Sequence, residues 1–190
     1  GKGALSANCG AGNTAVGLEA LKACTNNRNT ALGYHAGLVM TGGDNNTVLG
    51  YESGLAVVGG HNNTFVGRSA GAAVNSGTFN TTVGALAGDT ITTGVRHVCI
   101  GDNSGAVLAG GNDCIMIGST TTASTANAAS QYAMGSGVTC VGNGNFTFGS
   151  GTSDSNIANG ATSISAPSDQ RYKEEIADAT AGLSFINDLR

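Results

Sequence analysis

The segments "NTALGYHAG" (29–37), "NTVLGYESG" (46–54) and "NTFVGRSAG" (63–71) repeat one pattern along this chain of 190 residues. Related segments begin at residues 13 and 80, and less regular copies occur at 97–105, 114–122 and 131–135. One glycine marks each repeat, and we call these eight residues the anchor glycines: Gly17, Gly33, Gly50, Gly67, Gly84, Gly101, Gly118 and Gly135. The first step between anchors is 16 residues, and the next six are 17 residues each. A fixed period of this length is the sequence signature of a repeat architecture.

A short strand pattern precedes each anchor glycine. The residue before the anchor is apolar in all eight repeats, and the residue two positions earlier is Thr, Val or Ile in the first seven. This period-two alternation of β-branched residues predicts a β-strand. A second short apolar segment follows in most repeats, for example at 37–40 and 54–58, and glycine-rich turns separate the two. Each repeat is therefore predicted to be strand, tight turn, strand, tight turn.

These repeats predict an all-β fold, namely a parallel β-solenoid or β-roll with coils of about 17 residues. Stacked coils would pair strand on strand and bury an aliphatic ladder. Eight coils spaced by ~4.8 Å would extend over roughly 40 Å. Because two short strands enclose few side chains, association with identical chains would add the burial that one coil lacks. We expect a homotrimer of parallel chains, either intertwined or side by side.

The composition excludes several other classes of protein. The chain has 32 glycines but one proline, which excludes collagen, and its 40% hydrophobic and 11% charged residues disfavour disorder. The net charge is −4 and the eight Lys and Arg residues are scattered, so no nucleic-acid partner is expected. No apolar run approaches the ~20 residues that cross a bilayer, so membrane insertion is not expected either.

The cysteines and histidines do not follow the spacing of a metal site. Five cysteines stand at 9, 24, 99, 114 and 140 without a CxxC pair, which predicts small, mostly buried, reduced side chains and assembly in a reducing cytoplasm. The stretch 110–118 resembles a calcium-binding nonapeptide, but the nine-residue period with recurring aspartate is missing. His35, His61 and His97 occupy different repeat positions, so we expect them at the surface. We predict neither a metal nor a cofactor.

Groups for catalysis on an external substrate are not evident. The acidic residues up to Asp154 are scattered over the turns and form no close pair of the kind that glycosidases use. Polar turns that carry Tyr34, His35 and Tyr51 offer hydrogen-bonding groups to sugars, and they would equally keep the surface soluble. The sequence leaves both readings open.

The character of the chain changes after residue 135. Residues 1–135 form the repetitive shaft or head, and 136–167 lose the 17-residue period, which predicts an irregular β cap or connector. Residues 168–190 are rich in charge, and their apolar side chains follow helical spacing: Ile176, Ala179, Leu183 and Ile186. We expect a short α-helical segment there.

Two parts of the chain resemble known families. The repeats resemble the head repeats of trimeric autotransporter adhesins and the shaft repeats of phage and large-virus fibre proteins. The stretch from "SDQRYKEEI" to "GLSFINDLR" (168–190) resembles the start of the endosialidase-type intramolecular chaperone domain, which ends many phage tail fibres and tailspikes. The matching residues are Ser168, Asp169, Arg171, Tyr172, Lys173, Ile176, Ile186, Asn187 and Leu189.

This second resemblance implies an assembly route. In that family the chaperone trimerises, aligns three chains so that they fold in register, and is then released by autoproteolysis. The cleavage junction would be Ser168–Asp169, and Ser168 and Lys173 occupy the positions of the family's Ser/Lys dyad. A lysine can activate a serine when burial lowers the pKa of its amine. Residues 168–190 would then be a truncated start of the chaperone.

Together the resemblances imply a structural and host-receptor-binding fibre or spike of a virus, most simply a phage. Such a protein would be part of the virion, assembled in the host cytoplasm, and would contact other virion tail proteins and a host surface glycan or protein receptor. Its only expected chemistry would be self-cleavage. The alternatives that the sequence leaves open are a glycan-degrading tailspike enzyme and a bacterial trimeric surface adhesin.

Overall fold

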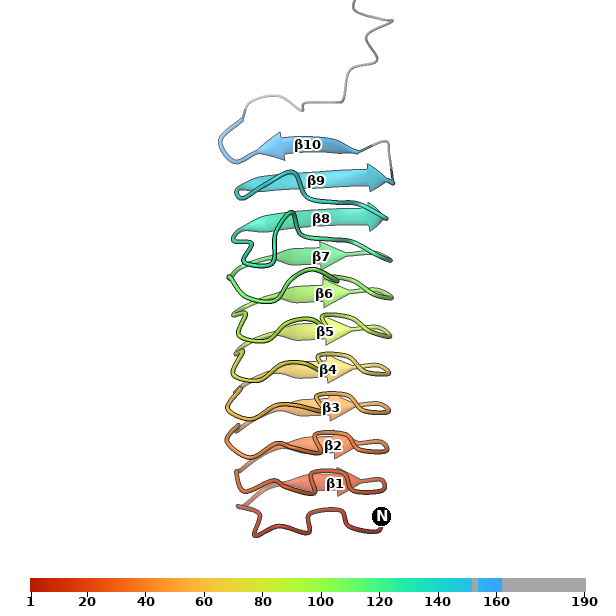
Figure 1. Ribbon diagram of the computed structural model, residues 1–190, viewed down its shortest axis with the longest axis vertical. Coiled ribbons are helices and arrows are strands. Elements are labelled where there is room, and N and C mark those ends of the chain that lie inside the picture. Colours follow the sequence, from red (N-terminus) through yellow and green to blue (C-terminus); the bar gives the residue numbers. More distant parts are fainter. Residues whose placement is uncertain (152–153, 162–190) are drawn as a thin grey trace, which may run out of the picture.

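A computed structural model describes residues 1–151 and 154–161 as one straight stack of coils (Figure 1). Its ten strands form a single sheet in chain order. The strands are β1 (Thr14–Val16), β2 (Thr30–Leu32), β3 (Thr47–Leu49), β4 (Thr64–Val66), β5 (Thr81–Val83), β6 (Val98–Ile100), β7 (Ile115–Ile117), β8 (Gln131–Ser136), β9 (Asn145–Ser150) and β10 (Ser155–Ala158). The described ranges contain no helix. The predicted fold class, a parallel β-solenoid with coils of about 17 residues, is confirmed; the helix expected within 168–190 lies outside the described residues.

The repeat period sets the register of the sheet. Strands β1 to β9 pair in parallel, and equivalent residues of successive repeats lie opposite each other, as Thr30 lies opposite Thr47 and Thr47 opposite Thr64. β10 pairs antiparallel with β9, so the parallel ladder ends there (Figure 1). One strand per coil is therefore stacked along the whole length of the rod.

The second strand predicted for each repeat is wrong. Residues 37–40 and 54–58 lie in turns and bends, although their backbone groups still bond to the next coil, for example from Gly37 N–H to Ser53 C=O at 2.9 Å. The reason is local: the residue two positions after the anchor adopts a left-handed conformation, with φ of 55° at His35, and Gly37 follows with φ of 62°. Left-handed residues break an extended run, so the segment bonds between coils without strand geometry.

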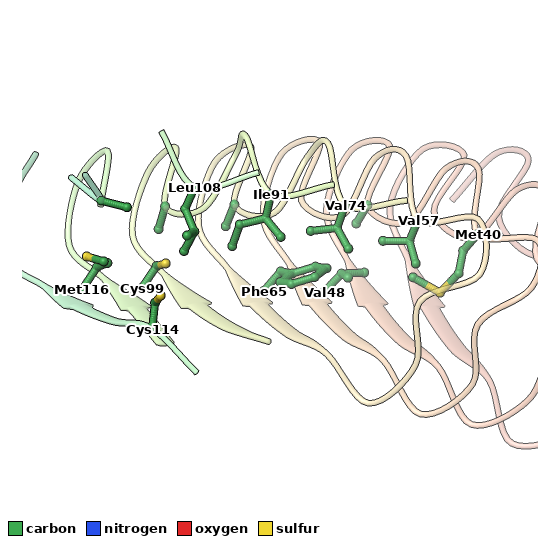
Figure 2. Packing of buried hydrophobic residues seen from close by; sticks show 14 of the residues in the cluster. Met40, Val48, Val57, Phe65, Val74, Ile91, Cys99, Leu108, Cys114 and Met116 are labelled. Carbon is green, nitrogen blue, oxygen red and sulfur yellow. The ribbon is translucent and has the colours of Figure 1, made fainter. Parts of the chain in front are cut away.

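The core is thin and consists of facing columns of side chains (Figure 2). One column comes from the middle residue of each strand, including Val48, Phe65, Cys99 and Met116. The facing column comes from the residue seven positions after the anchor, including Met40, Val57, Val74, Ile91 and Leu108. Small residues three positions after the anchor, such as Ala36 and Ala70, fill the space between the columns.

The apolar residues directly before the anchors point away from this core. Val16 is 55% exposed and Leu32 is 47% exposed. Successive side chains of a strand point to opposite faces, so a buried middle residue sends both of its neighbours outward. The buried ladder is therefore that of the middle residues, and the residues that define the alternation in the sequence lie on the surface.

The cysteines are free thiols, as predicted, and Cys24, Cys99, Cys114 and Cys140 are buried while Cys9 is half-buried. Burial raises the pKa of the Cys99 and Cys140 thiols to about 12. These side chains pack as small apolar groups in the core.

Candidate functional site

The outward side chains of the strands form one continuous surface, which we call the outer strand face. It consists of the residues one and three positions before each anchor in β1 to β8, together with Phe146 and Phe148 of β9, which lie opposite Tyr132 and Met134 in the ladder. None of these residues is charged. The face runs along the whole rod because the strands stack in register.

Apolar side chains on this face are well exposed. Besides Val16 and Leu32, the exposed fraction is 39% for Leu49, 39% for Ile100 and 48% for Met134. A monomeric soluble protein rarely exposes a contiguous apolar patch larger than ~300–600 Å², and larger ones mark interaction surfaces. The arrangement suits packing against another apolar surface of similar length.

A second feature is a polar and aromatic corner at the turns after the second and third anchors. The Tyr34 and Tyr51 rings stack with centroids 5.2 Å apart and planes within 6°. The His35 ring lies 3.7 Å from that of Tyr34, and His35 Nε2 lies 3.3 Å from Glu19 Oε2. The Lys22 ammonium, 2.9 Å from Glu19 Oε1, lowers the pKa of that carboxyl, and a hydrogen bond to Glu52 raises the pKa of Tyr51.

This corner holds the residues that the sequence offered as a sugar-binding candidate. The Tyr34 ring contacts the rings of both His35 and Tyr51, while Tyr34 and Tyr51 remain 40% and 50% exposed. The corner therefore offers a ligand hydrogen-bonding groups together with exposed tyrosine ring surface.

A ladder of asparagine side chains runs through the interior, four residues before the anchors. We call Asn13, Asn29, Asn46, Asn63 and Asn80 the asparagine ladder. Each Oδ1 accepts a hydrogen bond from the backbone N–H of the next rung, at 2.8 Å from Asn46 to Asn29 and 3.0 Å from Asn63 to Asn46. Each buried Nδ2 donates to a glycine carbonyl of its own coil, as Asn46 does to Gly60 at 2.8 Å. The ladder satisfies the buried backbone groups where the chain enters each strand.

His97 continues the asparagine ladder, and the expectation that all three histidines lie at the surface is wrong for it. Its ring is fully buried. Nδ1 accepts a hydrogen bond from the Cys114 backbone N–H at 3.2 Å, so Nε2 carries the proton and donates to Gly110 C=O at 3.1 Å. Burial lowers the pKa of His97, which keeps the ring neutral. His35 and His61 are half-buried at the surface.

The sequence did carry a signal for the asparagine ladder. Asparagine precedes threonine in the first five repeats, four residues before the anchor in each. A polar residue that recurs at the same position of successive stacked repeats indicates a column of side chains hydrogen-bonded to one another.

The predicted autocleavage residues Ser168, Asp169 and Lys173 lie outside the described residues. Among residues 1–151 and 154–161, no three His, Cys, Asp or Glu side chains gather in a way that would hold a metal ion. No helix in the part of the chain that the structure describes has the length and apolar character needed to cross a membrane.

Comparisons of this chain with models of protein families, with curated proteins and with solved structures found no match.

Proposed function

We propose that this chain is the shaft of a virus fibre or spike, built as a parallel homotrimer and used for attachment to a host receptor. The observation that carries the proposal is the outer strand face: an uncharged, largely apolar surface that runs along a straight rod. A rod with such a face gains stability by packing along its length against equal rods.

The thin core supports the same conclusion. Each coil buries few large side chains, and several strands place Ala or Thr at the middle position, as Ala31 and Thr82 do. Small buried residues contribute little apolar burial, so association would add a substantial share of the stability. A trimer whose chains pack through the outer strand face provides that burial.

The chaperone-like motif at 168–190 favours a virus fibre over a bacterial adhesin, which would share the trimeric rod. In this proposal the chaperone sets the register of repeats that are too similar to set it alone. Cleavage then breaks the C–N bond between Ser168 and Asp169, with Ser168 as the nucleophile and Lys173 as the base that takes the hydroxyl proton and passes it to the leaving Asp169 amine. Water then hydrolyses the ester that remains and leaves a free carboxylate on Ser168. The receptor is contacted by the polar turns, among them the corner that presents Tyr34, His35 and Tyr51.

The oligomeric mass in solution tests the central claim. Light scattering coupled to size exclusion is expected to give three times the 18.6 kDa of one chain, and a monomer at micromolar concentration would contradict it. For self-cleavage, the gene is expressed with its natural C-terminal extension, and the intact masses of the wild type and Ser168→Ala are compared. Cleavage of the wild type alone is expected, and two uncut products would refute this step.

A further inference from the structure

The outer strand face changes in composition between β5 and β6. In each of the strands β1 to β5, one outward residue is threonine and the other is aliphatic, as with Thr47 and Leu49. In β6 both outward residues are aliphatic, Val98 and Ile100, and the same holds for β7. The apolar surface is therefore one residue wide over the N-terminal five strands and two residues wide beyond them.

The face also becomes larger and more aromatic toward the last strands. β8 and β9 have six residues each where β1 to β7 have three. Their outward residues include Tyr132, Phe146 and Phe148, and the two phenylalanine rings lie 5.3 Å apart. Ile157 of β10 lies opposite Phe146 in the sheet and extends the same surface. We call the outward residues of β6 to β9, together with Ile157, the C-terminal patch.

The area of the face fits a protein partner. A standard protein–protein interface buries about 800 Å² on each partner, and an apolar face along the whole rod is of that order. Eight of the thirteen apolar residues of the outer strand face lie in β6 to β9, and Ile157 adds a ninth to the C-terminal patch, although Val16 and Leu32 of the N-terminal strands are among the most exposed. Aromatic and Met side chains, which the patch supplies, are enriched at the centres of such interfaces.

The spacing and charge of the face identify the partner as a second copy of this chain. Its side chains recur at the ~4.8 Å spacing of stacked strands, and a second solenoid of this chain carries a ladder with the same spacing. A lipid surface would require a row of basic residues beside the apolar ones, whereas the chain has a net charge of −4 and the position directly after the anchor holds Arg68 beside β4 but Asp102 beside β6.

We infer that contact between copies of this chain is concentrated in the C-terminal patch and weakens toward β1, so that association begins at the β10 end of the rod. The inference rests on the proposed homotrimer and names the part of the face that holds it together. The threonines of β1 to β5 are β-branched and so favour the strand conformation, but they add less apolar surface to the contact than the aliphatic residues at the same positions of β6 and β7.

Two matched substitutions test the inference. Leu49 and Ile100 occupy the same repeat position, directly before an anchor, and each is 39% exposed. Ile100→Glu is expected to convert the trimer to monomer at micromolar concentration and to weaken self-association at least 100-fold. Leu49→Glu is expected to remain trimeric, with self-association weakened less than 10-fold. Analytical ultracentrifugation over a concentration series measures both.

A milder variant guards against misfolding. Ile100→Thr gives β6 the outward composition of the N-terminal strands and keeps a β-branched residue, so its circular dichroism should match the wild type while its self-association weakens. Equal weakening by Leu49→Glu and Ile100→Glu in a trimeric protein would overturn the inference and leave the trimer standing. A monomeric wild type would overturn both the inference and the proposed homotrimer. Both would also be overturned if that monomer floated with phosphatidylcholine–phosphatidylserine vesicles and Ile100→Glu abolished the flotation.

Discussion

Replacement of Asn63 by alanine tests the asparagine ladder at its centre. The Asn63 side chain is 1% exposed and makes four hydrogen bonds. Nδ2 donates to Gly77 C=O at 2.9 Å and to Asn46 Oδ1 at 3.0 Å. Oδ1 accepts from the Asn80 backbone N–H at 2.9 Å and from Asn80 Nδ2 at 3.2 Å. Asn63→Ala removes all four without changing the strand.

The expected cost follows from the groups that the substitution leaves without partners. The backbone N–H of Asn80 and the carbonyl of Gly77 both lie in the buried interior and lose the partner described above. Each buried group without a partner costs about 1–3 kcal/mol, so the free energy of unfolding should fall by about 2–6 kcal/mol. Typical domains are stable by ~5–15 kcal/mol, so such a loss is large.

Urea denaturation followed by far-ultraviolet circular dichroism measures the loss. Asn75→Ala is the matched control, because Asn75 is an exposed turn residue of the same coil and its amide has no ladder partner. Exposed substitutions of this kind change stability by about 0.5 kcal/mol or less. If Asn63→Ala unfolds at the same urea concentration as Asn75→Ala, the ladder does not stabilise the rod and the reasoning fails.

Three further predictions follow from other positions. Burial lowers the pKa of His97 in the folded chain, so the unfolded chain binds a proton on this imidazole more readily than the folded chain does. The free energy of unfolding therefore decreases as the pH falls through the ordinary histidine pKa of ~6.5. His97→Asn, which restores the residue of the preceding coils, should reduce this acid sensitivity in thermal melts at pH 7.5 and 5.0, and an unchanged pH dependence would contradict it. Gly67→Ala should lower the free energy of unfolding by about 3 kcal/mol or more, because φ is 137° at Gly67 and a Cβ there would collide with the anchor carbonyl of the next coil. Gly59→Ala is the control: its Cβ meets no atom within 4 Å, so the same urea assay should show no change. Of the five thiols, only half-buried Cys9 should react quickly with a disulfide reagent in the native state, and fast reaction of Cys99, whose pKa burial raises to about 12, would refute the packed core.

The sequence alone was sufficient to predict the solenoid. The anchor glycines recur at 17-residue steps, and a parallel ladder that joins equivalent residues, such as Val48 to Phe65, is the direct result of that period. The alternation before each anchor located every strand from β1 to β7 at its observed residues. Stacking of identical units leaves little freedom in the register, because a slip of one residue would exchange the buried and exposed side chains.

The sequence pattern did not show which side chains of each strand point into the core. A strand of three residues has one side chain on one face and two on the other, and in "TVL" (47–49) or "VCI" (98–100) both sets contain apolar residues. Closure of the coil decides which set is buried. It brings Val57, seven residues after Gly50 in the sequence, opposite the middle residues of the strands (Figure 2). The outer strand face is therefore a product of the closed coil.

The period, the parallel order of the strands and the fold class all follow from the amino-acid pattern, because repeats of equal length stack equivalent residues. Which side chains lie inside depends on closure of the coil in three dimensions. Asn46 and Gly60 are 14 residues apart, and they bond at 2.8 Å because the coil turns back on itself. His97 is buried for the same reason, since from Asn29 to Gln131 the closed coil places each residue four positions before an anchor in the interior, whatever its type.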